Sequence, residues 1–157
     1  MKIKLLQIGK TTDEFIENGL IHYAKRLKHY AHFEIKTIPY LKNKGTISEQ
    51  LQKNAEGIKL LNDINPKDFL ILLDDKGKQL NSNEFALQIE KITLAGHSTL
   101  LFALGGAYGF SDAVYQRANL QISLSKLTFS HQLVRLVFAE QIYRAFTILN
   151  HEPYHHE

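Results

Sequence analysis

Two kinds of hydrophobic pattern alternate along this chain of 157 residues. Short apolar runs are typical of strands buried in a parallel sheet, and they predict strands at residues 2–8, 33–38, 69–73, 99–104 and 120–123. Between these runs, apolar residues recur at helical spacing, and a last helix is predicted over residues 131–149. The order βαβαβαβαβα favours an α/β fold, with a mainly parallel sheet and helices on both of its faces.

Polar or glycine-rich segments punctuate these elements. Residues 74–78 are expected to form a turn after the third strand, and the glycine-rich segment 105–109 follows the fourth strand. Thr11 or Thr12 is predicted to cap the first helix and Ser48 the second, because a hydroxyl can accept a hydrogen bond from a backbone N–H of the first turn.

Length and composition limit the class of protein. The chain is 44% hydrophobic and 22% charged, which predicts one domain, residues 1–157, that buries a substantial core. No apolar run approaches the roughly 18–20 residues needed to span a membrane, and the apolar part of the N-terminus is too short for a signal peptide. The absence of cysteine excludes disulfides, thiolate metal sites and cysteine nucleophiles. We therefore expect a cytoplasmic protein.

The charge of the chain is weakly informative. Lys and Arg number 19 against 16 Asp and Glu, and the net charge is +3. The excess lies in the first part of the chain, in lysine clusters at residues 25–28, 42–44 and 76–78. These clusters permit an anionic partner such as RNA but do not argue for one, and solvated surface lysines are the favoured interpretation.

The glycine-rich segment is the first candidate for a binding site. In α/β sheets ligands bind beyond the carboxyl ends of strands, and Gly105, Gly106 and Gly109 lie at such an end. Glycine lets the backbone approach a nucleotide-sized ligand closely, although a tight turn alone would also require it. The spacing G-G-x-x-G matches neither the dinucleotide-binding pattern nor the phosphate-binding loop.

The end of the chain carries two further features. The apolar stripe of the last predicted helix is wider than packing on a sheet requires, which indicates a dimer interface. Beyond the helix, His151, Pro153, Tyr154, His155 and His156 form a short polar tail. A metal site there is not supported, because two of the histidines are adjacent and no constellation of carboxylates or cysteines accompanies them. A disordered tail is the alternative.

Several motifs at matched spacing resemble one enzyme family over the whole chain. The motifs are Leu73-Asp74, Gly105-Gly106-x-x-Gly109, the hexapeptide Leu124-Ser125-Lys126-Leu127-Thr128-Phe129, His131-Gln132-x-x-Arg135, Glu140-Gln141-x-Tyr143-Arg144-Ala145 and Pro153-Tyr154-His155. They resemble the SPOUT-class methyltransferases that modify a pseudouridine of large-subunit ribosomal RNA. Ser130 departs from the family, which commonly has proline there, and we expect it to loosen the loop before the last helix.

The resemblance implies a fold, a cofactor and a reaction. The fold is an α/β sheet with a C-terminal trefoil knot, and the reaction is methylation of N3 of a pseudouridine in 23S ribosomal RNA, within the large subunit or the whole ribosome. The implied cofactor is S-adenosylmethionine. It would be held by Leu73, Gly105, Gly106, Leu124, Ser125, Lys126, Leu127, Thr128 and Phe129. Members pair as homodimers, and each tail completes the site of its partner. The family implies neither a metal nor a membrane.

The resemblance also suggests catalytic residues, namely Tyr154, His155 and Arg135. Tyr154 could stack on the target base or hydrogen-bond to it, and His155, or less plausibly His131, could take the N3 proton. Arg135 and Arg144 could hold RNA phosphate or the cofactor carboxylate.

More ordinary roles exist for some of these residues. Arg144 could pair with Glu140 one helical turn away, Tyr143 could pack in the core, and His131 could simply begin the helix. The alternative function is a nucleotide- or RNA-binding α/β module without catalysis, in which the glycine-rich segment is structural and the lysine clusters dominate.

Overall fold

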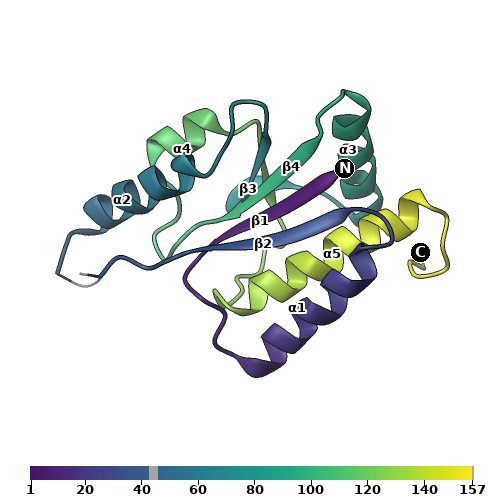
Figure 1. Cartoon of the computed structure of the whole chain (residues 1–157), viewed down its shortest axis with the longest axis horizontal. Helices are drawn as coiled ribbons and strands as arrows, with labels where there is room; N and C mark the ends of the chain where they lie inside the picture. Colours follow the sequence, from purple (N-terminus) through teal and green to yellow (C-terminus); the bar gives the residue numbers. More distant parts are fainter. Residues whose placement is uncertain (43–45, 157) are drawn as a thin grey trace.

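The computed structural model describes residues 1–42 and 46–156. In this part of the chain five parallel strands form one sheet, in the order β2-β1-β4-β3-β5. The strands are β1 (Lys2–Ile8), β2 (His32–Ile38), β3 (Phe69–Gln79), β4 (Thr99–Leu104) and β5 (Leu120–Ser123). The helices are α1 (Glu14–Leu27), α2 (Glu49–Asn62), α3 (Ser82–Leu94), α4 (Asp112–Arg117) and α5 (Leu133–Leu149) (Figure 1). The predicted α/β class and element order are confirmed, and the lysine cluster at 42–44 lies mostly outside the described residues.

Helices cover both faces of the sheet, as the sequence predicts. On one face α1, α3 and α5 pack over a core that includes Phe85, Phe102 and Phe138. On the other face α2 and α4 contribute Leu60 and Val114 to a second core. The central strands are buried from both sides, which explains why their sequences are continuously apolar rather than alternating.

The third strand is longer than the sequence predicts. Residues 74–78 do not form a turn, because β3 continues through them to Gln79. Pairing with β5 is interrupted after Leu73 and resumes where Lys78 lies opposite Ile122. A Cβ on Gly77 would lie 2.5 Å from the carbonyl carbon of Ile122, so only glycine allows the two backbones to approach this closely. The polar residues belong to an edge pairing that local sequence could not reveal.

The helix caps differ partly from those predicted. Ser48 caps α2 as expected, since its hydroxyl accepts a hydrogen bond from the backbone N–H of Leu51. The residue before α1 is Asp13, and neither Thr11 nor Thr12 caps this helix. Thr11 instead accepts a hydrogen bond from Arg135, in a contact described below. Its hydroxyl is therefore engaged in tertiary structure rather than in local capping.

The start of α5 is anchored by Ser130. The predicted helix at 131–149 begins at Leu133, and the hydroxyl of Ser130 accepts a hydrogen bond of 3.1 Å from the backbone N–H of that residue. Proline could not make this contact. The expectation of a loosened loop is thereby corrected, because serine fixes the first turn of the helix through its side chain.

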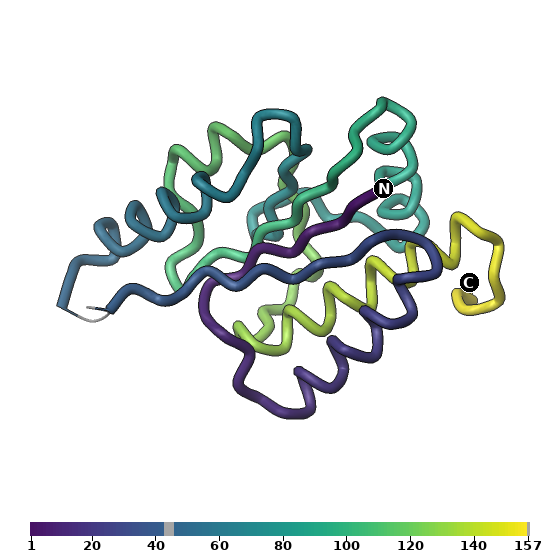
Figure 2. The backbone as a smooth tube through the Cα atoms, in the orientation of Figure 1, coloured from purple at the N-terminus to yellow at the C-terminus, as the bar shows by residue number. Residues whose placement is uncertain are grey.

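Helix α5 carries the chain from the carboxyl ends of the strands back to their amino ends (Figure 2). Its 17 residues correspond to about 25 Å. At its far end Phe146 stacks on Tyr30, which lies just before β2, and the Tyr30 hydroxyl donates a 2.6 Å hydrogen bond to Glu152. The C-terminal tail is therefore held at the amino-terminal edge of the sheet. None of the described helices has the length and apolarity needed to cross a membrane.

Replacing Phe138 by Ala should destabilise the fold strongly. Phe138 is fully buried and its ring lies 4.6 Å from that of Phe102, so the substitution leaves a cavity under the centre of the sheet. We expect a loss of about 3–5 kcal/mol in the free energy of unfolding, measured by urea denaturation. Leu94→Ala is the control, because this leucine is 80% exposed. Equal losses in the two variants would contradict the described core.

Candidate functional site

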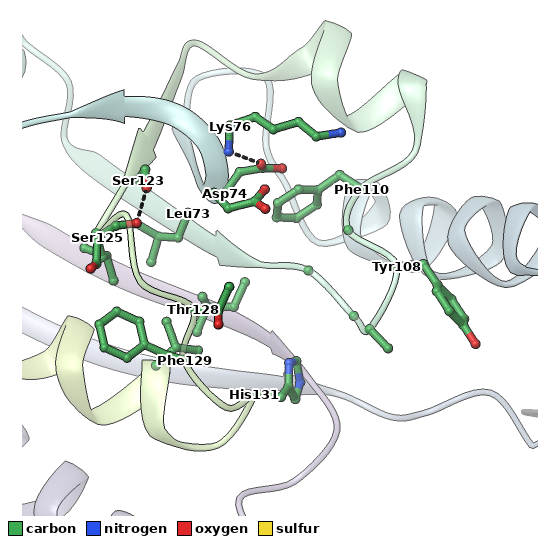
Figure 3. A pocket seen from close by; sticks show the side chains of 18 of the residues that line it. Leu73, Asp74, Lys76, Tyr108, Phe110, Ser123, Ser125, Thr128, Phe129 and His131 are labelled. Atoms are coloured by element: carbon green, nitrogen blue, oxygen red, sulfur yellow. Dashed lines mark hydrogen bonds between the residues drawn. The ribbon is translucent and has the colours of Figure 1, made fainter.

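A cavity of about 510 Å³ opens at the carboxyl edge of the sheet, where β3, β4 and β5 end (Figure 3). All the residues predicted to hold a cofactor line it except Lys126; they are Leu73, Gly105, Gly106, Leu124, Ser125, Leu127, Thr128 and Phe129. These residues come from three separate segments of the chain. The parallel sheet brings the segments together because its strands all end at the same edge.

The glycine-rich segment forms a tight turn beside this cavity. The backbone N–H of Gly109 donates a hydrogen bond of 3.1 Å to the carbonyl of Gly106, and Gly109 has a φ of +78°. A Cβ on Gly106 would lie 2.2 Å from Oε2 of Glu56. The turn thus requires glycine for its own geometry, and at Gly105, Gly106 and Gly109 it presents bare backbone to the cavity, beside the side chain of Tyr108.

The segment between β5 and α5 forms a second wall. The Ser123 hydroxyl donates a hydrogen bond of 2.9 Å to the carbonyl of Ser125, and the Ser125 hydroxyl accepts one of 2.9 Å from the N–H of Leu127. These two bonds fix a turn from which Leu127 projects with 78% of its surface exposed. An exposed leucine beside a cavity offers apolar area for a ligand to cover.

The carboxylate of Asp74, which belongs to a sequence motif but was assigned no role, lines the same cavity. One Asp74 oxygen accepts a hydrogen bond of 2.9 Å from the N–H of Lys76, and the other accepts a short hydrogen bond from the Tyr115 hydroxyl. Burial alone would raise the pKa of Asp74, but these two donors outweigh it and hold the pKa below its usual value. Burial and the bond to Asp74 raise the pKa of Tyr115. The pair is a fixed anionic group in the cavity.

His131 lies on the same side of the cavity as Thr128 and Phe129 (Figure 3). Its Nε2 is 3.0 Å from the carbonyl oxygen of Ile8. Because a carbonyl only accepts hydrogen bonds, His131 donates through Nε2. The residue lies just before α5, which begins at Leu133, and its contact with Ile8 links the start of this helix to the end of β1.

Arg135 lies inside the protein rather than on the cavity surface. Its side chain is fully buried, and its guanidinium donates hydrogen bonds of 2.9 Å to the carbonyl of Ile8 and to the hydroxyl of Thr11. Burial lowers the pKa of Arg135. Sequence reasoning placed Arg135 among the catalytic residues, whereas the structure places it beneath the loop that follows β1.

The C-terminal tail is held by a cluster of polar and aromatic side chains on α1 and α5. The Tyr154 hydroxyl donates to Glu140 at 3.2 Å, and Glu140 also forms an ion pair with Arg144, as the i, i+4 spacing suggested. Arg144 Nη1 lies 3.4 Å from Nδ1 of His155. Burial is the main cause that raises the pKa of Tyr154, and a hydrogen bond with Tyr23 is the second cause.

Within one chain the tail and the cavity are far apart. Figures 1 and 2 both place the tail at the end of α5, whereas the cavity includes Val134 at the start of this helix. The structure therefore does not bring Tyr154 and His155 to the cavity of their own chain. Tyr143 is buried and contacts the ring of Tyr154, so it packs as the more ordinary interpretation suggested.

Comparison with protein families decides the family. A family model described as "Predicted SPOUT methyltransferase" matches residues 1–155. This chain belongs to the SPOUT methyltransferase family. The match spans all five strands and the tail as far as His155, so it includes both the cavity and the residues suggested for catalysis.

Relatives of similar length support the assignment. Proteins named "Ribosomal RNA large subunit methyltransferase H" from Parabacteroides distasonis and Christiangramia forsetii are each 51% identical to the chain, and the alignments cover 100% and 99% of both sequences. The protein of that name from Porphyromonas gingivalis is 46% identical over 100% of both. A solved structure described as a probable methylase family protein from Haemophilus influenzae overlays with a TM-score of 0.47 at 13% identity, covering 96% of this chain and 66% of that one. The assignment rests on the sequence matches.

Replacing Arg135 by Ala should destabilise the fold, because this side chain ties α5 to the end of β1 and the loop after it. The substitution removes two charge-assisted hydrogen bonds and leaves a void, and we expect a loss of about 3 kcal/mol in the free energy of unfolding. Thermal and urea unfolding measure this effect. Lys126→Ala, at an exposed position, serves as the control, and an Arg135 variant as stable as this control would contradict the described contacts.

Proposed function

We propose that this protein is an S-adenosylmethionine-dependent methyltransferase that methylates N3 of a pseudouridine in 23S ribosomal RNA. The observation that carries the proposal is the cavity built from three segments at the carboxyl edge of the sheet, in a chain of the SPOUT methyltransferase family. The RNA target follows the names of the full-length relatives. A ribosomal substrate implies action in the cytoplasm, on the large subunit or the assembled ribosome.

The cavity fits the proposed cofactor in size and chemistry. Its volume of about 510 Å³ lies within the usual range for small-molecule sites. Adenine is flat and uncharged, so it suits the apolar side chains of Leu73, Leu124 and Phe129, with backbone groups of Gly105 and Gly106 supplying hydrogen bonds. Bound S-adenosylmethionine would supply a methyl group that is already activated by its sulfonium. The chain must then align the acceptor nitrogen and assist the loss of its proton.

The position of the tail supports a homodimer. Tyr154 and His155 can reach a cofactor cavity only in a second chain, because α5 separates them from their own. Apolar side chains on α1 and α5 remain partly uncovered, among them Ile21 at 47% and Leu133 at 37% exposed. We propose that these helices meet their counterparts in a second copy, and that each tail completes the cavity of its partner. A symmetric pair of this kind contains two equivalent sites.

The contact between Arg144 and His155 favours one catalytic role over another. An arginine only donates hydrogen bonds, so Nδ1 of His155 accepts from it. The neutral ring then carries its proton on Nε2 and presents a donor to the RNA. Such a donor would stabilise the negative charge that develops on the pyrimidine ring as the N3 proton passes to water. Tyr154, held by Glu140, would contact the same base, while Arg135 positions the loop after β1.

The path of the chain after β5 is compatible with the trefoil knot of the family. β5 lies at one edge of the sheet beside β3, whereas α5 packs on α1 and α3 and is bonded to the end of β1. The connection at residues 124–132 therefore crosses the ends of β3 and β4, where the loop at 105–110 also lies. We propose that it threads through that loop, and a crystal structure traced through residues 100–135 tests this path.

Binding and transfer assays test the function directly. We expect calorimetry to detect S-adenosylmethionine binding, and we expect ribosomes that lack the modification to accept a methyl group from it. Absence of cofactor binding at millimolar concentration would contradict the proposal. RNA binding that depends strongly on salt but ignores the cofactor would instead support the non-catalytic alternative.

Replacing His155 by Ala should lower turnover far more than cofactor affinity. Loss of one charge-stabilising donor typically lowers kcat by about 10²–10³-fold, and His155→Gln, which keeps a donor, should recover part of it. Single-turnover methylation assays give the rate, and calorimetry gives the cofactor affinity. An unchanged rate in the alanine variant would remove the tail from the mechanism.

Mixed dimers test whether the tail acts on the partner's cavity. Thr128→Trp fills the cavity of one chain, and His155→Ala disables the tail of the other. Each homodimer should be inactive, while a mixed dimer retains one intact composite site and about half the activity of the wild type. Inactive mixed dimers would contradict the shared site.

A further inference from the structure

The cofactor cavity contains one carboxylate whose position is fixed on both sides. Asp74 follows Leu73 directly, at the end of the buried part of β3. Its Oδ1 accepts from the backbone N–H of Lys76 at 2.9 Å (Figure 3). Its Oδ2 accepts from the Tyr115 hydroxyl. The first donor belongs to the same strand and the second to α4. The carboxylate is therefore clamped by two elements.

Tyr115 is itself held in place. Its ring lies edge-on to that of Phe110, with centroids 5.8 Å apart and an interplanar angle of 80°. A Cβ on Gly109 would lie 3.8 Å from the Tyr115 hydroxyl, so the glycine turn passes close to this group without a side chain between them. Tyr115 thus links Asp74 to the glycine turn, although the two segments are far apart in sequence.

The geometry leaves Asp74 with unused acceptor capacity. Each carboxylate oxygen can accept two hydrogen bonds. The Lys76 N–H fills one position on Oδ1 and the Tyr115 hydroxyl fills one on Oδ2, with the Asp75 side chain as a further neighbour. One free acceptor position per oxygen suits a ligand with two adjacent hydroxyls, such as the 2′ and 3′ hydroxyls of a ribose. An acidic residue beyond a strand end binds ribose hydroxyls in the same way in dinucleotide-binding folds.

The neighbouring residues favour this ligand group over a cation. Leu73, which would contact adenine, directly precedes Asp74 in β3, and both residues line the same cavity. Asp75, the next residue, is exposed and lines the same cavity. If the cavity simply attracted a cationic ligand, Asp74 and Asp75 would contribute alike. Only Asp74 is held in one position by two hydrogen bonds, as a directional contact with ribose hydroxyls requires.

We propose that Asp74 binds the ribose hydroxyls of the cofactor, and that Tyr115 is the positioning residue that holds this carboxylate. The proposal rests on the proposed function, since it concerns the same cavity and the same cofactor. Tyr115 acts through Asp74 and does not contact the ligand.

Calorimetry on the full chain with two ligands tests the proposal. S-adenosylmethionine is cationic at sulfur, whereas 5′-methylthioadenosine keeps the adenine and ribose but carries no charge. Asp74→Asn should lower the affinity for both ligands by a similar factor, about 10- to 100-fold, which is the cost of losing hydrogen bonds to a charged group. Asp75→Asn, which removes the same charge one residue away, should change either affinity by less than about 3-fold.

Two further measurements separate the sugar contact from a structural effect. The 2′,3′-dideoxy form of methylthioadenosine should bind the wild type and Asp74→Asn equally well. Tyr115→Phe should weaken both ribose-containing ligands by a smaller factor than Asp74→Asn, and it should leave binding of the dideoxy form unchanged.

Three results would overturn the proposal. The first is a loss confined to S-adenosylmethionine, which would assign Asp74 to the cation. The second is an equal effect of Asp75→Asn, and the third is an equal loss for the dideoxy ligand. If the wild type binds neither natural ligand, the proposed function itself fails, and this outcome is distinct from failure of the Asp74 assignment alone.

Discussion

The common direction of the five strands determines where chemistry can occur in this molecule. Because all the strands of the sheet are parallel, their carboxyl ends lie on one side of the molecule. Each helix that connects two strands must therefore carry the chain back to the side where the amino ends lie. The ends of β3, β4 and β5 therefore meet around one cavity. The same constraint sends α5 away from that cavity and leaves the tail at the opposite edge. A site that needs both the cavity and the tail has to be shared between two chains.

The start of α5 is tied to the end of β1 by buried and backbone contacts. Arg135 and His131 both donate to the carbonyl of Ile8, and Gln132 accepts from the N–H of Thr12. These bonds fix the position of α5 relative to the sheet. They thereby also fix the segment just before α5, which forms one wall of the cavity. A buried arginine is costly to desolvate, and the hydrogen bonds of Arg135 to Ile8 and Thr11 tie α5 to the loop that follows β1.

The sequence predicts the sheet well because its signals are local. Continuous apolar runs mark the buried strands, and the glycine turn marks the strand end that borders the cavity. The extension of β3 was missed because its partner, β5, lies far along the chain. Asp74 was recognised as part of a motif but received no role for a similar reason, because its donor Tyr115 is 41 positions away. The burial of Arg135 also runs against expectation, because arginine is rarely buried. The knot entered only through the resemblance to a family.

The absence of cysteine from the chain permits a direct test of the shared site. Leu127 lies at the cavity of one chain and His156 in the tail, so one population of chains receives Leu127→Cys and another His156→Cys. When the two are mixed and oxidised, the account predicts a disulfide-linked species of twice the 18.0 kDa chain mass, formed faster than in either population alone. Equal or absent cross-linking in the mixture would contradict the claim that each tail reaches the cavity of its partner.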